Sequence, residues 1–296
     1  MTEFGRLMTA MITPFNEKGE VDYKEAIKVA EFLVETGTDT IVLAGTTGES
    51  PTLTHEEEFT LFKTIRDAVG SRVKLMAGTG SNCTRTAIAS TKEAEKLGLD
   101  ASLQVVPYYN RPSQEGLYQH FKAIAESVKF PILLYNIPGR TGRNMEPETI
   151  ARLAEIPNII GIKEAAGSVE QVAKIRQLTP PDFLIYSGDD GLTLAFMKEG
   201  AYGVVSVASH CVGRQIKDMM TLFAAGNQKE AYQIEDNLNP IFKVLFINSN
   251  PAPLKYALHA MGFKVGIPRL PLVEVTPNEK DQIAAVLQAL EIVAEV

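Results

Sequence analysis

Cysteine, histidine and tryptophan are scarce in this sequence of 296 residues, which has two cysteines, four histidines and no tryptophan. Cys83 and Cys211 lie far apart and neither belongs to a Cys-X-X-Cys motif, so we expect no disulfide framework and a reducing, cytoplasmic location. No two histidines form a His-X-X-X-His pair. The sequence therefore predicts no zinc site.

An excess of positive charge is also absent. Lys and Arg total 29 against 36 Asp and Glu, which gives a formal net charge of −7. A chain of this sign is a poor general binder of nucleic acid or of an anionic membrane, and we expect neither partner. No apolar run has the length of a membrane span, and Met1–Met11 lacks the apolar core of a secretion signal.

Short apolar runs that alternate with longer amphipathic segments are the dominant pattern. The runs are rich in Val, Ile and Leu and mostly continuous, which is typical of strands buried on both faces. The predicted strands are Leu7–Ile12, Thr40–Ala44, Val73–Ala77, Ser102–Val106, Ile132–Tyr135, Ile159–Lys163, Leu184–Ser187 and Gly203–Val207.

Helical patterns fill the intervals between these runs. The predicted helices are Asp22–Glu35, Thr54–Val69, Thr84–Leu97, Glu115–Val128, Glu148–Ala154, Val169–Leu178 and Leu192–Glu199. Thr54 and Glu57 have the spacing of a capping box. Strand–helix alternation indicates parallel strands joined by crossover helices, and eight units in about 225 residues fit a closed (β/α)8 barrel of the α/β class. An open doubly wound sheet is the alternative, but the Gly-X-Gly-X-X-Gly turn that it favours is absent.

The pattern changes after Gly226. Gln228–Phe246, Pro253–Met261 and Asn278–Ala294 all have helical periodicity, with no strand between them. We therefore predict a catalytic barrel over residues 1–226 and a C-terminal helical domain over residues 227–296.

Lys163 is the sharpest candidate for chemistry. It ends the apolar run from Ile159, and the active sites of such barrels lie at the C-terminal ends of the strands. An amine at the rim of an apolar barrel is partly desolvated, which lowers its pKa towards neutrality, and a neutral amine can attack a ketone to form an imine. On position alone, a strand-end lysine that extends into solvent is an equally good interpretation.

Three further elements end at the same predicted rim. The Tyr135 phenol ends the adjacent strand and can carry a proton. The loop Gly45–Ser50 can direct backbone N–H groups at a carboxylate, and Arg140 follows a Pro-Gly turn that suits bidentate carboxylate binding. Asp189 and Asp190 follow the seventh strand, where they would repel a phosphate, and we interpret them as helix caps.

Several of these segments resemble the 4-hydroxy-tetrahydrodipicolinate synthases, also called dihydrodipicolinate synthases, within the pyruvate-dependent aldolase superfamily. The likeness runs in order over nearly the whole chain. The segments that carry it are Gly-Thr-Thr-Gly-Glu-Ser at 45–50, Pro-Tyr-Tyr-Asn-Arg-Pro at 107–112, Leu-Tyr-Asn-Ile-Pro-Gly-Arg-Thr-Gly at 134–142, Gly-Ile-Lys-Glu at 161–164 and Tyr-Ser-Gly-Asp-Asp at 186–190.

The resemblance implies a reaction and its participants. Pyruvate would condense with Lys163, and the resulting enamine would attack L-aspartate 4-semialdehyde, the entry step of diaminopimelate and lysine biosynthesis. No cofactor and no metal are implied. A homo-oligomer is implied, either a dimer or a homotetramer built as a dimer of dimers, because one site residue would come from a neighbouring subunit.

The resemblance also implies roles for individual residues. Tyr135, Thr47 and Tyr109 would form a proton relay, with Tyr109 supplied by the neighbour. The region of Thr46 and Thr47 would hold the pyruvate carboxylate, Arg140 would hold the semialdehyde carboxylate, and the backbone around Gly188 and Val205 would line the pocket.

Two other functions are compatible with much of the pattern. A sister aldolase, such as N-acetylneuraminate lyase or a 2-keto-3-deoxy sugar-acid aldolase, would share the lysine and the tyrosine, but Arg140 favours a short substrate with its own carboxylate. A non-catalytic pyruvate sensor is disfavoured, because a binding protein needs no proton relay.

Many synthases of this kind are inhibited by L-lysine, bound between subunits. The corresponding positions here are Ser50, Pro51, His55, Glu58, Asn82, Thr86 and Tyr108. Glu58 stands where sensitive members usually have histidine, and Thr86 where they usually have glutamate. Loss of that acceptor predicts weak or absent inhibition by L-lysine.

Overall fold

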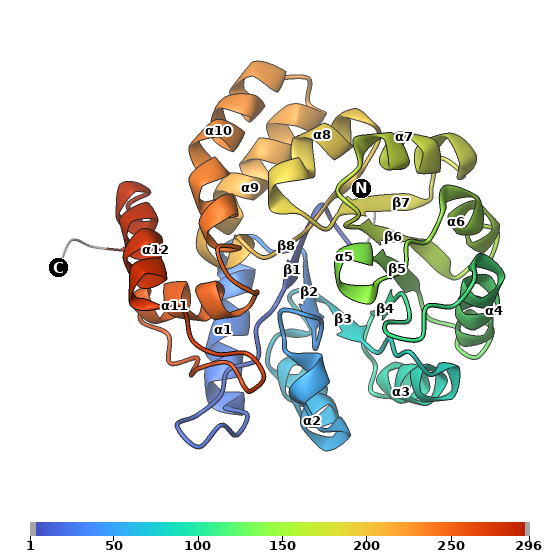
Figure 1. The fold of residues 1–296 in the computed structure, drawn as a ribbon, viewed down its shortest axis with the longest axis horizontal. Helices are drawn as coiled ribbons and strands as arrows, with labels where there is room; N and C mark the ends of the chain where they lie inside the picture. Colours follow the sequence, from blue (N-terminus) through green and yellow to red (C-terminus); the bar gives the residue numbers. More distant parts are fainter. Residues whose placement is uncertain (1–3, 294–296) are drawn as a thin grey trace. The chain divides into compact units, whose positions relative to one another are not determined.

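The computed structural model describes residues 4–293, and its eight strands form a closed barrel in chain order (Figure 1). The strands are β1 (Leu7–Ala10), β2 (Thr40–Leu43), β3 (Lys74–Gly78), β4 (Ala101–Val105), β5 (Ile132–Asn136), β6 (Ile159–Glu164), β7 (Leu184–Ser187) and β8 (Gly203–Ser206). Every predicted strand is present with its ends within two residues. The predicted (β/α)8 fold is confirmed.

Helices alternate with the strands and continue beyond them. They are α1 (Tyr23–Glu35), α2 (His55–Val69), α3 (Thr84–Lys96), α4 (Gln114–Ala125), α5 (Pro138–Thr141), α6 (Pro147–Leu153), α7 (Val169–Leu178), α8 (Thr193–Lys198), α9 (Ser209–Ala224), α10 (Gln228–Val244), α11 (Ala252–Ala260) and α12 (Pro277–Ala289), with short 3-10 turns η1 (Ser50–Thr52) and η2 (Asp190–Leu192).

The helices depart from the sequence prediction in three places. Pro138–Thr141, expected as a turn, forms a short helix that begins with proline and ends at Gly142, whose φ of 71° is left-handed. α9 lies in a segment for which no helix was predicted, and Val212 within it has non-helical backbone angles. The last predicted helix begins as expected but ends at Ala289, and its predicted end, Ala294, lies outside the described residues.

The chain forms two compact units, which are described separately. The central unit is Lys74–Val205, and the terminal unit combines Met1–Val73 with Ser206–Val296. Residues 227–296 thus share a compact unit with the start of the chain, and the domain boundary that we expect after Gly226 stays a prediction.

In the central unit, parallel strands are surrounded by their crossover helices. β3 to β7 pair side by side, and α3, α4, α6 and α7 follow one another around them (Figure 1). Leu133, Leu134, Ile162 and Ile185 are fully buried on these strands, because one face meets the barrel interior and the other meets helices. Hence the strands appear in the sequence as continuous apolar runs.

A bulge between β5 and β6 sets which residues lie opposite each other. Ile132 pairs with Ile159, but the next residue, Leu133, pairs with Gly161, so Ile160 is the extra residue. Because side chains alternate along a strand, this one-residue shift decides which side chains share a face. As a result Tyr135 lies opposite Lys163.

In the terminal unit, β1 and β2 pair in parallel, and the C-terminal helices pack on one another. α10 contacts α9 and α12, and α11 contacts α12 and α9 (Figure 1). Buried His210 links the turn after β8 to the segment after β1, since its Nε2 accepts from the Ile12 N–H while its Nδ1 lies 2.9 Å from the Val207 carbonyl oxygen. The predicted capping box of Thr54 and Glu57 is confirmed.

No helix within residues 4–293 is both long enough and apolar enough to cross a bilayer.

Candidate active site

Lys163 lies on β6 between two tyrosines on the neighbouring strands. It is in register with Tyr135 of β5 and Tyr186 of β7. The next residues, Asn136 and Glu164, face the helix layer, where Gln171 of α7 donates to Glu164 at 3.1 Å. Because successive side chains of a strand point to opposite faces, Lys163 and Tyr135 face the barrel interior. The sequence prediction that these two side chains converge is confirmed.

The Lys163 side chain is closely packed and buried. The Lys163 Nζ lies 4.3 Å from the centre of the Tyr135 ring, and the lysine is only 6% exposed. A Cβ at Gly188 would lie 3.0 Å from the Lys163 Cε and 2.6 Å from the Ala165 Cβ. Glycine at position 188 therefore leaves the room that the lysine stem occupies.

Burial makes the Lys163 amine far less basic than an ordinary lysine. Its pKa is lowered from 10.5 to about 8, mainly by desolvation. Two charges have smaller effects: Asp190 raises the pKa, and Arg140 lowers it. Each pKa unit corresponds to about 1.4 kcal/mol, and at pH 7 a group of pKa 8 is about one-tenth neutral. The structure thus supplies an appreciable population of nucleophilic amine near neutral pH.

Asp189 and Asp190 have different roles, although the sequence suggested one. Asp189 caps the turn Asp190–Leu192, since its side chain accepts from the Gly191 N–H at 2.9 Å. Asp190 is 3% exposed, and its charge acts on Lys163. The capping prediction is confirmed for Asp189, whereas the electrostatic role of Asp190 was missed.

Glu164 anchors the end of β6 from the helix-facing side. Its carboxylate accepts from the Asn136 amide at 3.0 Å and from the Ala166 N–H at 2.7 Å, in addition to Gln171. Burial raises the pKa of Glu164, and these hydrogen bonds oppose that shift. This network fixes the strand ends that carry Tyr135 and Lys163.

The remaining predicted site residues of the central unit lie near its surface or in its last strand. Arg140 is exposed on α5, and Val205 is buried in β8. Tyr109 is 91% exposed and has a φ of 74°, a left-handed conformation that is uncommon for a residue with a side chain. Its ring therefore projects away from its own central unit.

Thr46 and Thr47 lie in the terminal unit, on a loop held at several points. The Glu49 N–H donates to the Thr46 carbonyl at 3.1 Å, and the Thr13 hydroxyl donates to the Gly48 carbonyl at 2.7 Å. Thr47 is 3% exposed, and its hydroxyl oxygen lies 2.9 Å from the amide nitrogen of Asn250.

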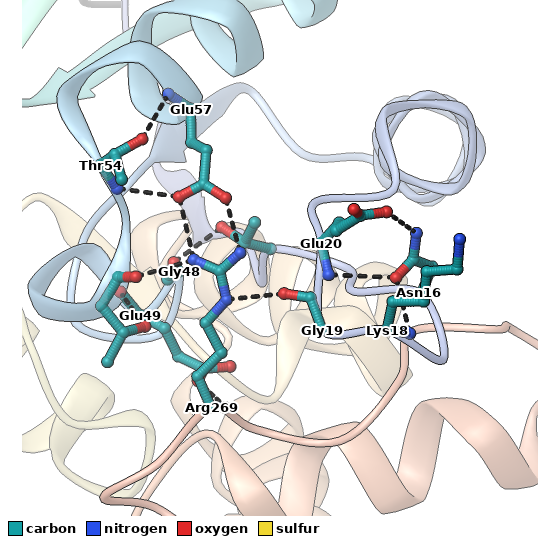
Figure 2. Close-up of polar contacts among 11 residues, drawn as sticks. Asn16, Lys18, Gly19, Glu20, Gly48, Glu49, Thr54, Glu57 and Arg269 are labelled. Atoms are coloured by element: carbon teal, nitrogen blue, oxygen red, sulfur yellow. Dashed lines mark hydrogen bonds and ion pairs between the residues drawn. The ribbon is translucent and has the colours of Figure 1, made fainter.

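A buried ion pair and a guanidinium secure the far end of this loop. The Lys255 Nζ lies 2.6 Å from the Glu49 Oε1, and both side chains are at most 2% exposed. Figure 2 shows Arg269 between Glu57, Gly19 and the loop: its guanidinium bonds both oxygens of Glu57, the Gly19 carbonyl and the Thr52 carbonyl. The backbone N–H of Arg269 also donates to the Glu49 Oε2 at 2.8 Å.

Comparison with known proteins agrees with this geometry. The model of the dihydrodipicolinate synthetase family matches residues 3–290. The chain belongs to this family. It is 55% identical over 293 residues to the 4-hydroxy-tetrahydrodipicolinate synthase of Cyanothece sp. (strain PCC 7425 / ATCC 29141), covering 99% of this chain and all of that relative. It is 58% identical over 275 residues to the same enzyme of Acaryochloris marina, covering 93% and 94%.

Solved structures of the family superpose closely on this chain. The dihydrodipicolinate synthase of Cyanidioschyzon merolae, solved with lysine bound, has a TM-score of 0.98 at 49% identity and covers 99% of this chain and 100% of its own. The enzyme of Aquifex aeolicus has a TM-score of 0.96 at 41% identity, with 99% and 100% covered.

In this family member, the structure therefore places Lys163, Tyr135 and Gly188 in contact range, with Arg140 and Asp190 close enough to act on the lysine charge. Asn250, Lys255 and Arg269, which hold the Thr46–Thr47 loop, were missed in the sequence. A lysine on the apolar helix Ala252–Ala260 is the one signal that could have identified part of this set. No three His, Cys, Asp or Glu side chains within residues 4–293 are grouped so as to hold a metal ion.

The two charges near Lys163 should shift its reactivity in opposite directions. Only the neutral amine attacks, so the rate of pyruvate capture should rise with pH through about 8 in the unmodified protein. Asp190→Asn removes a charge that raises the pKa, and the midpoint should move to lower pH. Arg140→Ala removes a charge that lowers the pKa, and the midpoint should move to higher pH.

The measurement is the initial rate of borohydride-trapped pyruvate adduct against pH, with peptide mapping of the labelled lysine. Lys163→Ala is the control and should give no label. Midpoints that move in the same direction, or a label on another lysine, would contradict the assignment of Lys163 and its electrostatics.

Proposed function

We propose that this chain condenses pyruvate with L-aspartate 4-semialdehyde to give 4-hydroxy-tetrahydrodipicolinate, the entry step of diaminopimelate and lysine biosynthesis. The observation that carries the proposal is the buried Lys163 amine, with its pKa lowered to about 8, facing the Tyr135 ring. The relatives named above carry the name of this activity. The two widely separated cysteines favour a cytoplasmic location.

Lys163 begins the reaction by attacking the C2 carbonyl of pyruvate. A carbinolamine forms, a proton transfers to its hydroxyl, and water leaves to give the imine. The protonated imine withdraws electrons, so the methyl carbon loses a proton and an enamine results. The enamine carbon attacks the aldehyde of the second substrate. The amino group of that substrate then attacks the imine carbon, closes the ring and releases the Lys163 amine.

Each of these steps moves a proton, and we assign that work to Tyr135, Thr47 and Tyr109. Tyr135 is supported by its place beside the Lys163 amine. Thr47 is supported by its buried hydroxyl and the fixed loop around it. A hydroxyl between two phenols can accept from one and donate to the other, which passes a proton without any change of charge on itself.

Carboxylate recognition is the second requirement, since both substrates carry one. We assign the pyruvate carboxylate to the region of Thr46 and Thr47, and we assign the backbone around Gly188 and Val205 to the lining of the pocket. Arg140 is assigned to the semialdehyde carboxylate, because a guanidinium binds a carboxylate through two parallel hydrogen bonds. Its exposed position on α5 is compatible with a substrate that enters after pyruvate.

The choice of second substrate separates this function from that of a sister aldolase. Aspartate semialdehyde should be turned over in the presence of pyruvate, whereas N-acetylneuraminate and 2-keto-3-deoxy sugar acids should not be cleaved at a comparable kcat/KM. A polyhydroxy substrate needs a hydrogen-bonding partner for each hydroxyl, and Arg140 favours a short carboxylate. The measurement is steady-state turnover of each substrate by the same preparation. Cleavage of the sugar acids as the faster reaction would refute the assignment, and pyruvate labelling without any product would indicate a sensor.

We further propose a homo-oligomer, a dimer or a homotetramer built as a dimer of dimers, in which Tyr109 completes the site of a neighbour. The left-handed backbone and 91% exposure of Tyr109 support a role outside its own subunit, and Tyr108 beside it is also exposed.

Mixing two inactive variants tests this shared site. Tyr109→Phe subunits keep Lys163, and Lys163→Ala subunits keep Tyr109, so a mixed dimer has one complete site of its two. Random exchange at equal amounts makes half of the dimers mixed, and about a quarter of the wild-type activity should return. Activity is measured after subunit exchange has been verified by mass spectrometry. Lys163→Ala mixed with the double variant is the matched control and should stay inactive; equal activity in both mixtures would argue against a shared site.

Inhibition by L-lysine is predicted to be weak or absent. Thr86 is exposed and carries no charge where an acceptor would be needed, and burial raises the pKa of Glu58 to about 7, so its carboxyl is only partly ionised at neutral pH. Any residual inhibition should strengthen as pH rises through 7, because Glu58 gains its charge there. Steady-state turnover against L-lysine at several pH values measures this, and Thr86→Glu should increase sensitivity at least about tenfold. Inhibition of the unmodified chain by submillimolar L-lysine would overturn the prediction.

A further inference from the structure

We propose that Asn144 is a positioning residue that sets where the Arg140 guanidinium lies, and so how well the second substrate is bound. This rests on the proposed function, in which Arg140 takes the semialdehyde carboxylate. Asn144 is half-buried and follows α5 near the end of the segment that carries Arg140. Both residues and all their partners named below belong to the central unit.

The segment that carries Arg140 is a loop closed on one side chain. It leaves β5 after Asn136 and returns to the same residue. The Asn136 Oδ1 accepts from the backbone N–H of Met145 at 3.0 Å, and the Asn136 Nδ2 donates to the Asn144 Oδ1 at 2.8 Å. A short loop whose ends are held together has few backbone conformations open to it. Arg140 lies midway between Asn136 and Asn144, so its place depends on both attachments.

The Asn144 amide joins this loop to α7 and, through it, to β6. The Asn144 Nδ2 donates to the Gln171 Oε1 at 2.9 Å, and the Gln171 Nε2 donates to the Asn144 Oδ1 at 3.2 Å, so the two amides bond each other reciprocally. The same Gln171 Nε2 donates to buried Glu164 at 3.1 Å, and Glu164 directly follows Lys163 in β6. An alanine side chain can neither donate nor accept, and a carboxylate cannot donate. The asparagine therefore links the Arg140 loop to the strand that carries the Lys163 amine.

The Arg140 side chain itself has no such anchor. It is exposed, and within residues 4–293 no hydrogen bond or ion pair holds its guanidinium. The backbone around it is fastened on the outer side to the start of α4, since the Arg143 Nε donates to the Pro112 carbonyl at 2.7 Å and the Gln114 Nε2 donates to the Asn144 carbonyl at 2.9 Å. The direction of Arg140 thus depends on the backbone of α5, which the Asn144 side chain ties to β5 and α7.

Electrostatics gives a second sign that Arg140 is near Lys163. Burial is the main cause of the lowered pKa of Lys163; Asp190 raises that pKa, and Arg140 lowers it. The effect of a charge falls with distance. If release of the loop at Asn144 lets the guanidinium move away, the pKa of Lys163 should rise. Pyruvate capture therefore reports on the position of Arg140 before the second substrate is present.

Asn144→Ala should impair use of the second substrate and spare that of the first. Arg140→Ala sets the scale, since loss of a bidentate charged contact weakens binding about ten- to a hundredfold. Above the pH midpoint of pyruvate capture, Asn144→Ala should lower kcat/KM for aspartate semialdehyde at least about fivefold and change KM for pyruvate less than about twofold. The midpoint of borohydride-trapped capture should move to higher pH, as for Arg140→Ala but by less. Unchanged kcat/KM for the semialdehyde would overturn the proposal.

A double-mutant cycle shows whether Asn144 acts through Arg140. Arg140→Ala removes the guanidinium, so adding Asn144→Ala to it should cause no further loss of kcat/KM for aspartate semialdehyde. Losses that multiply would show that Asn144 acts independently of Arg140 and would overturn the proposal. Asn144→Asp gives a second test, because it keeps the shape of the side chain but cannot donate to Gln171, and it should separate the two substrates in the same way.

Asn158→Ala is the matched control, with the same substitution of another half-buried asparagine at the opposite end of β6. Asn158 directly precedes the strand, and its Nδ2 donates to the Ala125 carbonyl at 3.0 Å. This variant should keep kcat/KM for both substrates within about twofold of wild type. A loss of semialdehyde use as large as that of Asn144→Ala would indicate a general effect of loosened packing, and would count against a specific role.

The outcome also separates this inference from the proposed function. Wild-type protein that captures pyruvate at Lys163 but forms no product with aspartate semialdehyde would refute the function itself. Wild-type protein that forms the product, with Arg140→Ala impaired and Asn144→Ala unimpaired, would leave the function standing and overturn the role of Asn144.

Discussion

The desolvation of the Lys163 amine is the constraint on which the central unit depends. An amine becomes nucleophilic near neutral pH only if its ammonium form is made costly, and burial among β5, β6 and β7 does this. That burial requires a bulge at Ile160 to bring Tyr135 opposite, and a glycine at position 188 to leave room for the lysine stem. The Glu164 network then fixes the strand ends from outside. The bulge, the glycine and the Glu164 network all serve to position the Lys163 Nζ.

A second buried lysine shows that a lowered pKa does not by itself identify the nucleophile. Burial also lowers the pKa of Lys255 to about 8, with Glu49 opposing the shift. Its ammonium, however, lies 2.6 Å from the Glu49 Oε1, and this ion pair favours the charged form. Removing one partner of a buried ion pair typically costs about 3–5 kcal/mol. Lys255 therefore stabilises a loop, whereas Lys163 lies beside the Tyr135 ring and Gly188.

The sequence predicted the barrel well because strands buried on both faces leave a strong local signal. Runs such as Ile159–Lys163 are apolar throughout, and the strand-end rule then placed Lys163 and Tyr135 on one rim before any family likeness was used. Contacts that depend on distant residues had no such signal. Asp189 and Asp190 were both interpreted as helix caps from the sequence, and only the folded chain shows which of the two affects Lys163. The Asn250 contact spans 203 positions, and an asparagine before a proline looks like an ordinary turn.

The C-terminal helices are therefore more than an appendage to the barrel. A boundary after Gly226 follows a real change in sequence pattern, yet residues 227–296 share a compact unit with residues 1–73. Within that unit, α11 holds Glu49 through Lys255, and Arg269 joins the loop to Glu57 and Gly19. Ala44, just before the loop, and Glu49, within it, have left-handed backbone, which costs energy for residues with a side chain. The ion pair from Lys255 and the hydrogen bond from Arg269 to Glu49 hold the loop in this conformation. It follows that the geometry of Thr47, although encoded near the N-terminus, is determined by residues more than 200 positions away.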